Sequence, residues 1–199
     1  MAAATHHLGI YLFDDMEELD AVGPYEVLAA WTSYFPDDGW VVTTMSDDGA
    51  PVTGAKGLTV VPHASVADAP ALDVLVYPGG LGTRARLADA SHLEWVRAMR
   101  ASTPLLASVC TGSLVLAAAG LLRDRPATTH WASLDALAAL DRTIEVRADA
   151  RFVDDGDVVT SAGVSAGIDM ALHLVARLAS VERAVAVRRG IQYDPAPPV

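Results

Sequence analysis

Cys110 is the single cysteine in a chain of 199 residues, and its surroundings favour a reactive role. It follows an apolar stretch typical of a buried strand, residues 103–109, and precedes a helix-like stretch rich in Ala and Leu. Ser108 and Gly112 flank it in the small-x-nucleophile-x-Gly spacing of a nucleophile elbow. The turn exposes the sulfur at a helix N-terminus, which stabilises a thiolate. We therefore predict a catalytic nucleophile; the alternatives are a small buried apolar residue or a tight turn that serves packing only.

Asp20 is the predicted proton carrier. It follows the first apolar stretch, residues 8–13, and lies at the same sheet edge as Cys110 if the strands are parallel. A carboxyl group there can hold or deliver a proton, and burial beside a thiolate would raise its pKa toward neutrality. The alternative is that Asp20 only caps a helix beginning near Pro24, because proline suits the first turn of a helix.

Gly79 and Gly80 follow another buried-type stretch, residues 73–77. Adjacent glycines allow backbone N–H groups to approach a ligand closely. Together with the amide of Thr111, they are expected to form a hole for developing charge, although the same pattern also makes ordinary turns. The spacing is not that of a dinucleotide fingerprint, so no nicotinamide cofactor is expected.

Two later residues are candidates for the same edge. His130 follows Cys110 by 20 residues, and a Cys–His pair is typical of proteases and transferases. Its neighbour Trp131 equally suits a helix N-terminus that packs beneath a pocket. Val164 opens a helix among small residues and is expected to form a pocket wall or a close helix–sheet contact. The histidines lack metal-ligand spacing, so we predict no metal.

The elements that position these residues alternate between strand-like and helix-like patterns. Predicted strands cover residues 8–13, 40–45, 57–61, 73–77, 103–109, 144–147 and 158–161. Predicted helices cover residues 24–31, a stretch containing Leu93, Val96 and Met99, a stretch closed by Gly120, residues 130–140 and 164–178, and a last stretch capped at Ser180. Such alternation predicts a doubly wound, mostly parallel α/β sheet with helices on both faces. We expect one domain over residues 1–199, with a non-helical tail at 193–198.

Composition excludes several classes of partner. The chain has 25 acidic and 14 basic residues and a formal net charge of −11, which disfavours nucleic acid and anionic membrane surfaces. No apolar run reaches the roughly 18 residues of a membrane span, and residues 1–7 do not resemble a signal peptide. One cysteine cannot form an internal disulfide, so a cytoplasmic location is expected.

The motifs together resemble the DJ-1/PfpI superfamily, and within it the isonitrile (isocyanide) hydratase branch. The superfamily resemblance rests on residues 19–24, 77–80, 108–114, 128–131 and 163–169; the hydratase resemblance rests on residues 110–116, 128–131 and 193–198. It implies a flavodoxin-like fold, related to class I glutamine amidotransferases, and a homodimer. Relatives of protease type carry His directly after the cysteine, whereas this chain carries Thr111, as the hydratases do. The hydratases also carry Asp at the position of Asp20, where many other relatives carry Glu.

The resemblance implies an enzyme that adds water to a small-molecule isocyanide and yields an N-substituted formamide through a thioimidate on Cys110. Catalytic roles would fall to Cys110, Asp20 and Thr111, with neither cofactor nor metal. The candidate substrate-binding residues are Gly79, Gly80, Leu81, Val164 and His130.

Two other functions resemble the same motif set. One is a sensing module like the N-terminal half of AraC-type regulators, in which a basic helix-turn-helix region follows the module. No such region precedes the last residue, Val199, which favours an enzyme unless the chain is a fragment. The other is a glyoxalase- or deglycase-like activity on reactive carbonyls, which Thr111 and Asp20 fit less well.

Overall fold

A seven-stranded sheet forms the centre of the computed structural model, which describes residues 5–195. Its strands lie in the order β10-β11-β7-β6-β1-β2-β5, and every pair is parallel except the edge pair β10–β11. The bounds are β1 His6–Tyr11, β2 Trp40–Ser46, β5 Ala64–Ser65, β6 Val74–Tyr77, β7 Leu105–Val109, β10 Phe152–Asp154 and β11 Val158–Ser161. The predicted doubly wound, mostly parallel sheet is confirmed.

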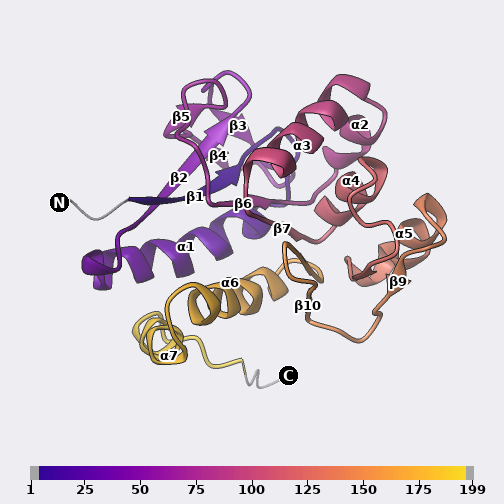
Figure 1. The fold of residues 1–199 in the computed structure, drawn as a ribbon. Coiled ribbons are helices and arrows are strands. Elements are labelled where there is room, and N and C mark those ends of the chain that lie inside the picture. The colour runs from indigo at the N-terminus through magenta and orange to yellow at the C-terminus, as the bar shows by residue number, and fades with distance from the viewer. Residues whose placement is uncertain (1–4, 196–199) are drawn as a thin grey trace.

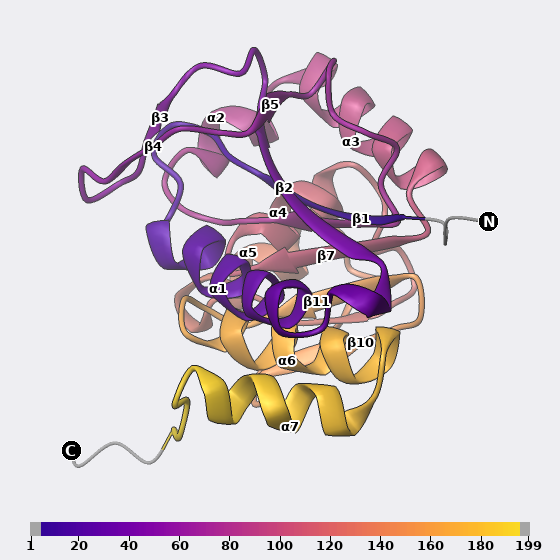
Figure 2. The same ribbon diagram turned by 90° about the vertical axis from the view of Figure 1, so that its left-hand side faces the viewer.

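Helices cover both faces of this sheet (Figures 1 and 2). One layer holds α1 Glu18–Tyr34, α6 Ala166–Leu178 and α7 Val181–Gly190, which pack on one another. The other holds α2 Thr83–Leu87, α3 Ala90–Ser102, α4 Gly112–Ala118 and α5 Leu134–Leu140. Two-stranded sheets pair β3 Val52–Thr53 with β4 Thr59–Val60, and β8 Pro126–Ala127 with β9 Glu145–Val146; single turns form η1 Pro36–Asp38 and η2 Trp131–Ser133.

The two central strands β6 and β7 position the candidate site. Each is buried at every residue, because helices cover both faces of the sheet and leave no position for a polar side chain facing water. Their register places Tyr77 beside Ser108. The segments that follow the strands, with Gly79 on one and Cys110 on the other, therefore leave the sheet side by side at its carboxyl edge.

The start of α1 differs from the prediction. The helix begins at Glu18 rather than near Pro24, so Asp20 lies inside its first turn. The N-cap residue is Glu17, and the interpretation of Asp20 as a cap is therefore wrong. Pro24 is buried within the helix and has no N–H to donate to the main-chain carbonyl of Asp20.

Other boundaries shift less. The expected strand at 57–61 is the short β4 of a hairpin, and that at 144–147 is β9 of a separate sheet, while β3, β5, β8 and β10 were not predicted. The cap at Ser180 is confirmed, since its Oγ accepts a hydrogen bond from the N–H of Arg183 at 3.2 Å. Residues 193–195 are not helical, and the remainder of the predicted tail, from residue 196, lies outside the described residues. Within residues 5–195, no helix combines the length and the apolar character that crossing a membrane requires.

Candidate active site around Cys110

Cys110 occupies the turn between β7 and α4 with a φ of 55°, in the left-handed region that residues with a side chain seldom adopt. Hydrogen bonds hold this conformation on both sides. The Cys110 N–H donates to the carbonyls of Ser161 and Ala162, each at 3.2 Å. Its carbonyl accepts from the hydroxyls of Thr129 at 2.9 Å and Ser113 at 3.1 Å. Neighbouring segments thus maintain the strained turn, as is common at functional sites.

Gly112 explains why the turn requires a small residue two positions after Cys110. A Cβ atom at Gly112 would lie 2.5 Å from the carbonyl oxygen of Tyr77 and 2.8 Å from that of Pro78. Ser108, two positions before the cysteine, is fully buried on β7. The predicted strand–turn–helix arrangement of the elbow is confirmed.

Asp20 is completely buried at the start of α1. Its Oδ2 accepts a hydrogen bond from the N–H of Gly79 at 2.9 Å, whereas its buried Oδ1 has no hydrogen-bond partner among the described residues. Burial raises the pKa of Asp20 to about 7, against the opposing effects of the Gly79 amide and the Cys110 thiol. The direction is the one expected from the sequence, and it makes this carboxyl group an acid that titrates near neutrality.

The expected low-pKa thiolate at Cys110 is wrong for this structure. Burial and the negative charge of Asp20 raise the pKa of Cys110 to about 12, although the backbone amides of Thr111 and Val164 act in the opposite direction. The helix-terminus amides are outweighed because the side chain is only 6% exposed and its nearest ionisable neighbour is an acid. Near neutral pH, Cys110 is therefore a thiol beside a carboxyl group that is able to accept its proton.

Thr111 and the glycine pair form a second hydrogen-bonded cluster. The Thr111 hydroxyl accepts from the N–H of Gly80 at 2.9 Å, and Thr83 donates to the Gly80 carbonyl at 2.7 Å. The amides of Gly79 and Gly80 thus donate to Asp20 and Thr111. The sequence had predicted that they face a substrate. The amides that act to lower the pKa of Cys110 are those of Thr111 and Val164, and Val164 was predicted as a pocket wall or a close helix–sheet contact.

His130 and Leu81, the remaining predicted site residues, make no hydrogen bond to Cys110 or Asp20 among those found in the described residues. His130 packs against the loop that carries Val164, since a Cβ at Gly163 would lie 2.2 Å from the His130 ring. Its Nδ1 accepts from the N–H of Ala132 at 3.3 Å, a helix-start role rather than a bond to sulfur. Leu81 is 58% exposed and lies in the glycine loop, residues 78–82, between β6 and α2. Thr129, whose hydroxyl donates to the Cys110 carbonyl, was not predicted as a site residue, although it directly precedes the predicted His130 in the sequence.

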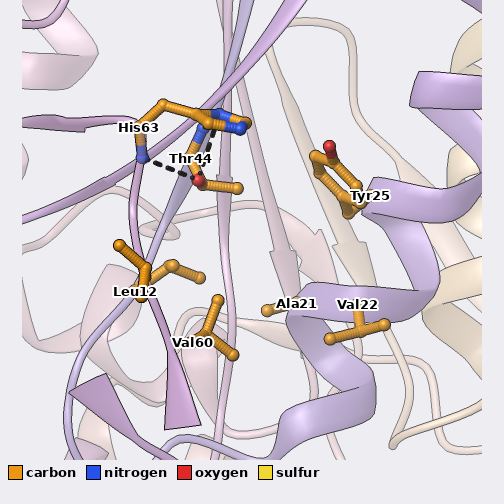
Figure 3. A pocket seen from close by; sticks show the side chains of 8 residues that line it. Leu12, Ala21, Val22, Tyr25, Thr44, Val60 and His63 are labelled. Atoms are coloured by element: carbon orange, nitrogen blue, oxygen red, sulfur yellow. Dashed lines mark hydrogen bonds between the residues drawn. The ribbon is translucent and has the colours of Figure 1, made fainter. Parts of the chain in front are cut away.

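One cavity lies close to Asp20 in the sequence of α1 but does not include Cys110. It has a volume of about 280 Å³ and lies between α1 and the residues of β2 and β4 that face it (Figure 3). Ala21, Val22 and Tyr25 line one wall, opposite Val60 and His63. We place the candidate active site at Cys110 all the same, because the coupled ionisable groups and strained backbone converge there. Among residues 5–195, no group of three or more His, Cys, Asp or Glu residues has the arrangement of a metal site.

Comparison with known proteins identifies the family of this chain. The model of the DJ-1/PfpI family matches residues 7–177, a span that contains all of the candidate residues. The chain belongs to the DJ-1/PfpI family. A DJ-1/PfpI relative, the isonitrile hydratase of Pseudomonas putida, is 42% identical over 191 residues, which cover 96% of this chain and 80% of the relative.

A solved DJ-1/PfpI structure and a regulator extend the comparison. The crystal structure of a ThiJ/PfpI family protein from Pseudomonas syringae has a TM-score of 0.87 at 35% identity, over 98% of this chain and 78% of that chain. The HTH-type transcriptional regulator GbdR of Pseudomonas aeruginosa is 35% identical over 153 residues, which are 76% of this chain but only 41% of the regulator. The family therefore includes an enzyme and a regulator among the proteins similar to this chain.

Proposed function

We propose that this protein adds water to an isocyanide and releases an N-substituted formamide, with Cys110 as the nucleophile. The observation that carries the proposal is the pairing of the Cys110 thiol with the buried carboxyl group of Asp20, in which each group shifts the pKa of the other. The 42% identity to an isonitrile hydratase supports the choice of substrate class. A small-molecule substrate also fits a site that lies at a sheet edge rather than on an extended surface.

The proposed chemistry uses one proton shared by the pair. As sulfur attacks the terminal carbon of the isocyanide, the carboxylate of Asp20 takes the thiol proton. Asp20 then transfers that proton to the same carbon, which gives a thioimidate, Cys–S–CH=N–R. Water adds to the thioimidate carbon, and collapse of the adduct breaks the C–S bond. The products are the formamide, R–NH–CHO, and the regenerated thiol of Cys110, so that one water is consumed per turnover.

The neighbouring groups have supporting roles in this proposal. The amides of Thr111 and Val164 stabilise negative charge on the sulfur as it loses its proton. The Gly79 amide holds Asp20, and the Gly80 amide holds Thr111, so these glycines orient catalytic side chains. We propose that Leu81 and His130 border the bound substrate. No step of this sequence requires a cofactor or a metal ion.

We further propose a cytoplasmic homodimer. A reducing compartment keeps the single cysteine as a thiol. Exposed apolar side chains lie on the elements around Asp20: Leu19, Val22, Leu58, Val61 and Leu81. A second copy that covers this surface would remove apolar area from water. Light scattering during size-exclusion chromatography should give twice the monomer mass, and a monomer at micromolar concentration would contradict the proposal.

The decisive assay follows the disappearance of a simple alkyl or aryl isocyanide and the appearance of its formamide. Cys110→Ala should abolish turnover, and Ser102→Ala, on the exposed end of α3, should leave it unchanged. The absence of turnover by the wild-type chain at high enzyme concentration would rule out the proposal. Full activity in Cys110→Ala would instead identify another nucleophile.

The similarity to GbdR supports a second candidate, a ligand-sensing module. Such a module would bind a small molecule reversibly without converting it. Recovery of unchanged isocyanide together with a saturable shift in melting temperature would favour sensing over catalysis. The alternative glyoxalase- or deglycase-like activity is tested by replacing the isocyanide with a 1,2-dicarbonyl compound and following its disappearance.

A further inference from the structure

Arg151 lies outside the catalytic cluster, but it contacts the Cys110 loop from two directions. Its main-chain carbonyl accepts a hydrogen bond from the N–H of Ala162 at 2.9 Å. The carbonyl of Ala162 in turn accepts from the N–H of Cys110 at 3.2 Å. A path of two backbone hydrogen bonds therefore leads from Arg151 to the strained cysteine.

The side chain of Arg151 reaches the far end of the same loop. Its Nε donates to Oδ2 of Asp169 at 2.8 Å, and its terminal nitrogen also contacts that oxygen and lies 3.5 Å from the hydroxyl of Ser165. Oδ1 of Asp169 accepts from the Tyr193 hydroxyl at 3.0 Å. The carboxylate is thus held from two sides in the first turn of α6.

The loop between these attachments carries Val164 in an unfavourable conformation. Val164 has a φ of 51°, which is costly for a β-branched residue and persists only where the surroundings impose it. Its amide is one of the two that favour negative charge on the Cys110 sulfur. A small displacement of this loop would therefore change the environment of the sulfur directly.

We propose that Arg151 is a positioning residue, which holds the 162–165 loop at both ends so that the amide of Val164 faces the sulfur of Cys110. The inference rests on the proposed role of Cys110 as nucleophile, but not on the identity of the substrate. The guanidinium is essential to it, because its Nε and terminal nitrogen both bind Oδ2 of Asp169 while the terminal nitrogen also reaches Ser165. A lysine offers a single point of charge and cannot make these contacts together.

The chain provides a matched control in Arg177. This residue also connects α6 to the edge of the sheet, through hydrogen bonds from its terminal nitrogen to the carboxylate of Asp154 at 2.9 and 3.1 Å. It lies at the opposite end of α6 from Val164. Arg177→Lys therefore weakens the Arg177–Asp154 pair, which also involves α6, without changing a contact of the 162–165 loop.

The test measures alkylation of Cys110 at fixed pH, which reports one site because the chain has one cysteine. Iodoacetamide and a bulky maleimide are compared in the wild type, Arg151→Lys and Arg177→Lys. Loss of the Val164 amide raises the pKa of Cys110, so both reagents should react about threefold more slowly in Arg151→Lys, equivalent to roughly half a pH unit. Altered access would instead change the ratio between the two reagents.

Hydrogen exchange over residues 161–168 provides an independent measurement. These amides should exchange on the order of fivefold faster in Arg151→Lys only. The proposal is overturned if Arg177→Lys gives the same changes, if the alkylation rates stay constant or rise, or if only the reagent ratio changes. Alkylation needs no isocyanide, so failure of the proposed hydration activity would be seen separately.

Discussion

The carboxyl group of Asp20 and the thiol of Cys110 are electrostatically coupled across the gap between α1 and the β7–α4 turn. The charge of Asp20 raises the pKa of Cys110, and the thiol lowers that of Asp20. Both groups are buried, so this mutual effect is weakly screened by water. The two residues act as one unit that holds a single proton over a wide range of pH.

The first prediction is that kcat/KM for an isocyanide rises with pH through about 7 and then reaches a plateau. Below that pH, Asp20 is protonated and cannot accept the proton of the Cys110 thiol, whose own pKa of about 12 leaves the thiolate scarce. Initial rates between pH 5 and pH 9 give the profile. A rate that decreases through neutrality would contradict this assignment of the proton.

The second prediction concerns Asp20→Asn. This variant keeps an acceptor for the Gly79 amide but cannot carry a proton, so kcat/KM should fall about 100-fold or more and lose its inflection near pH 7. Asp135→Asn, at an exposed position of α5, serves as the control and should retain the wild-type rate. Equal rates in the two variants would remove Asp20 from the mechanism.

The third prediction is that Asp20 makes folding stability depend on pH. Its pKa rises from 3.8 to about 7 in the folded chain, so the folded state binds the proton more tightly than the unfolded state. The contribution of Asp20 to the free energy of unfolding is therefore present at low pH and is lost as pH rises through about 7. The loss is about 2–3 kcal/mol between pH 5 and pH 8. Because other carboxyl groups also titrate, the measured quantity is the difference in urea-unfolding free energy between wild type and Asp20→Asn at the two pH values. A constant difference would contradict the raised pKa of the buried carboxyl group of Asp20.

The elements that carry Cys110 were predictable from local sequence. Residues 105–109 are apolar except for Ser108, a pattern that a strand buried on both faces produces. The start of α1 was not predicted because Pro24 is a strong local signal for a first turn, whereas burial of the α1 start against the glycine loop determines the true boundary. Strands of two or three residues, such as β5 and β10, are too short to show periodicity.

The electrostatics of the site depend on tertiary packing and could not be predicted in the same way. A helix start beside Cys110 favours a thiolate, but the sequence does not reveal how completely the sulfur and Asp20 are buried. Thr129 reaches the Cys110 carbonyl because the preceding Thr128 N–H binds the hydroxyl of Thr160 on β11 at 2.9 Å, a contact between residues far apart in the chain.

The fourth prediction tests the close approach at Gly79. A Cβ there would lie 2.5 Å from the Thr111 nitrogen and 2.9 Å from Oδ2 of Asp20, so Gly79→Ala must displace a catalytic side chain. Displacements of this size cost on the order of 100-fold in rate. The control is Gly57→Ala, which meets nothing within 4 Å but is strained by its φ of +94°. Its rate should match the wild type despite lower stability, whereas a fully active Gly79→Ala would show that the close contact is dispensable.

The fifth prediction isolates the hydroxyl of Thr111. Thr111→Val preserves the shape of the side chain but removes the acceptor for the Gly80 N–H, which leaves a donor unpaired at a cost of about 1–3 kcal/mol. The glycine loop then loses its register against the elbow, and kcat/KM should fall about tenfold. Thr111→Ser restores the hydroxyl and should recover most of the rate, while Thr53→Val, on an exposed hairpin strand, should change nothing. If Thr111→Val and Thr111→Ser are equally active, the threonine serves packing alone, and its match to the hydratase motif has no catalytic meaning.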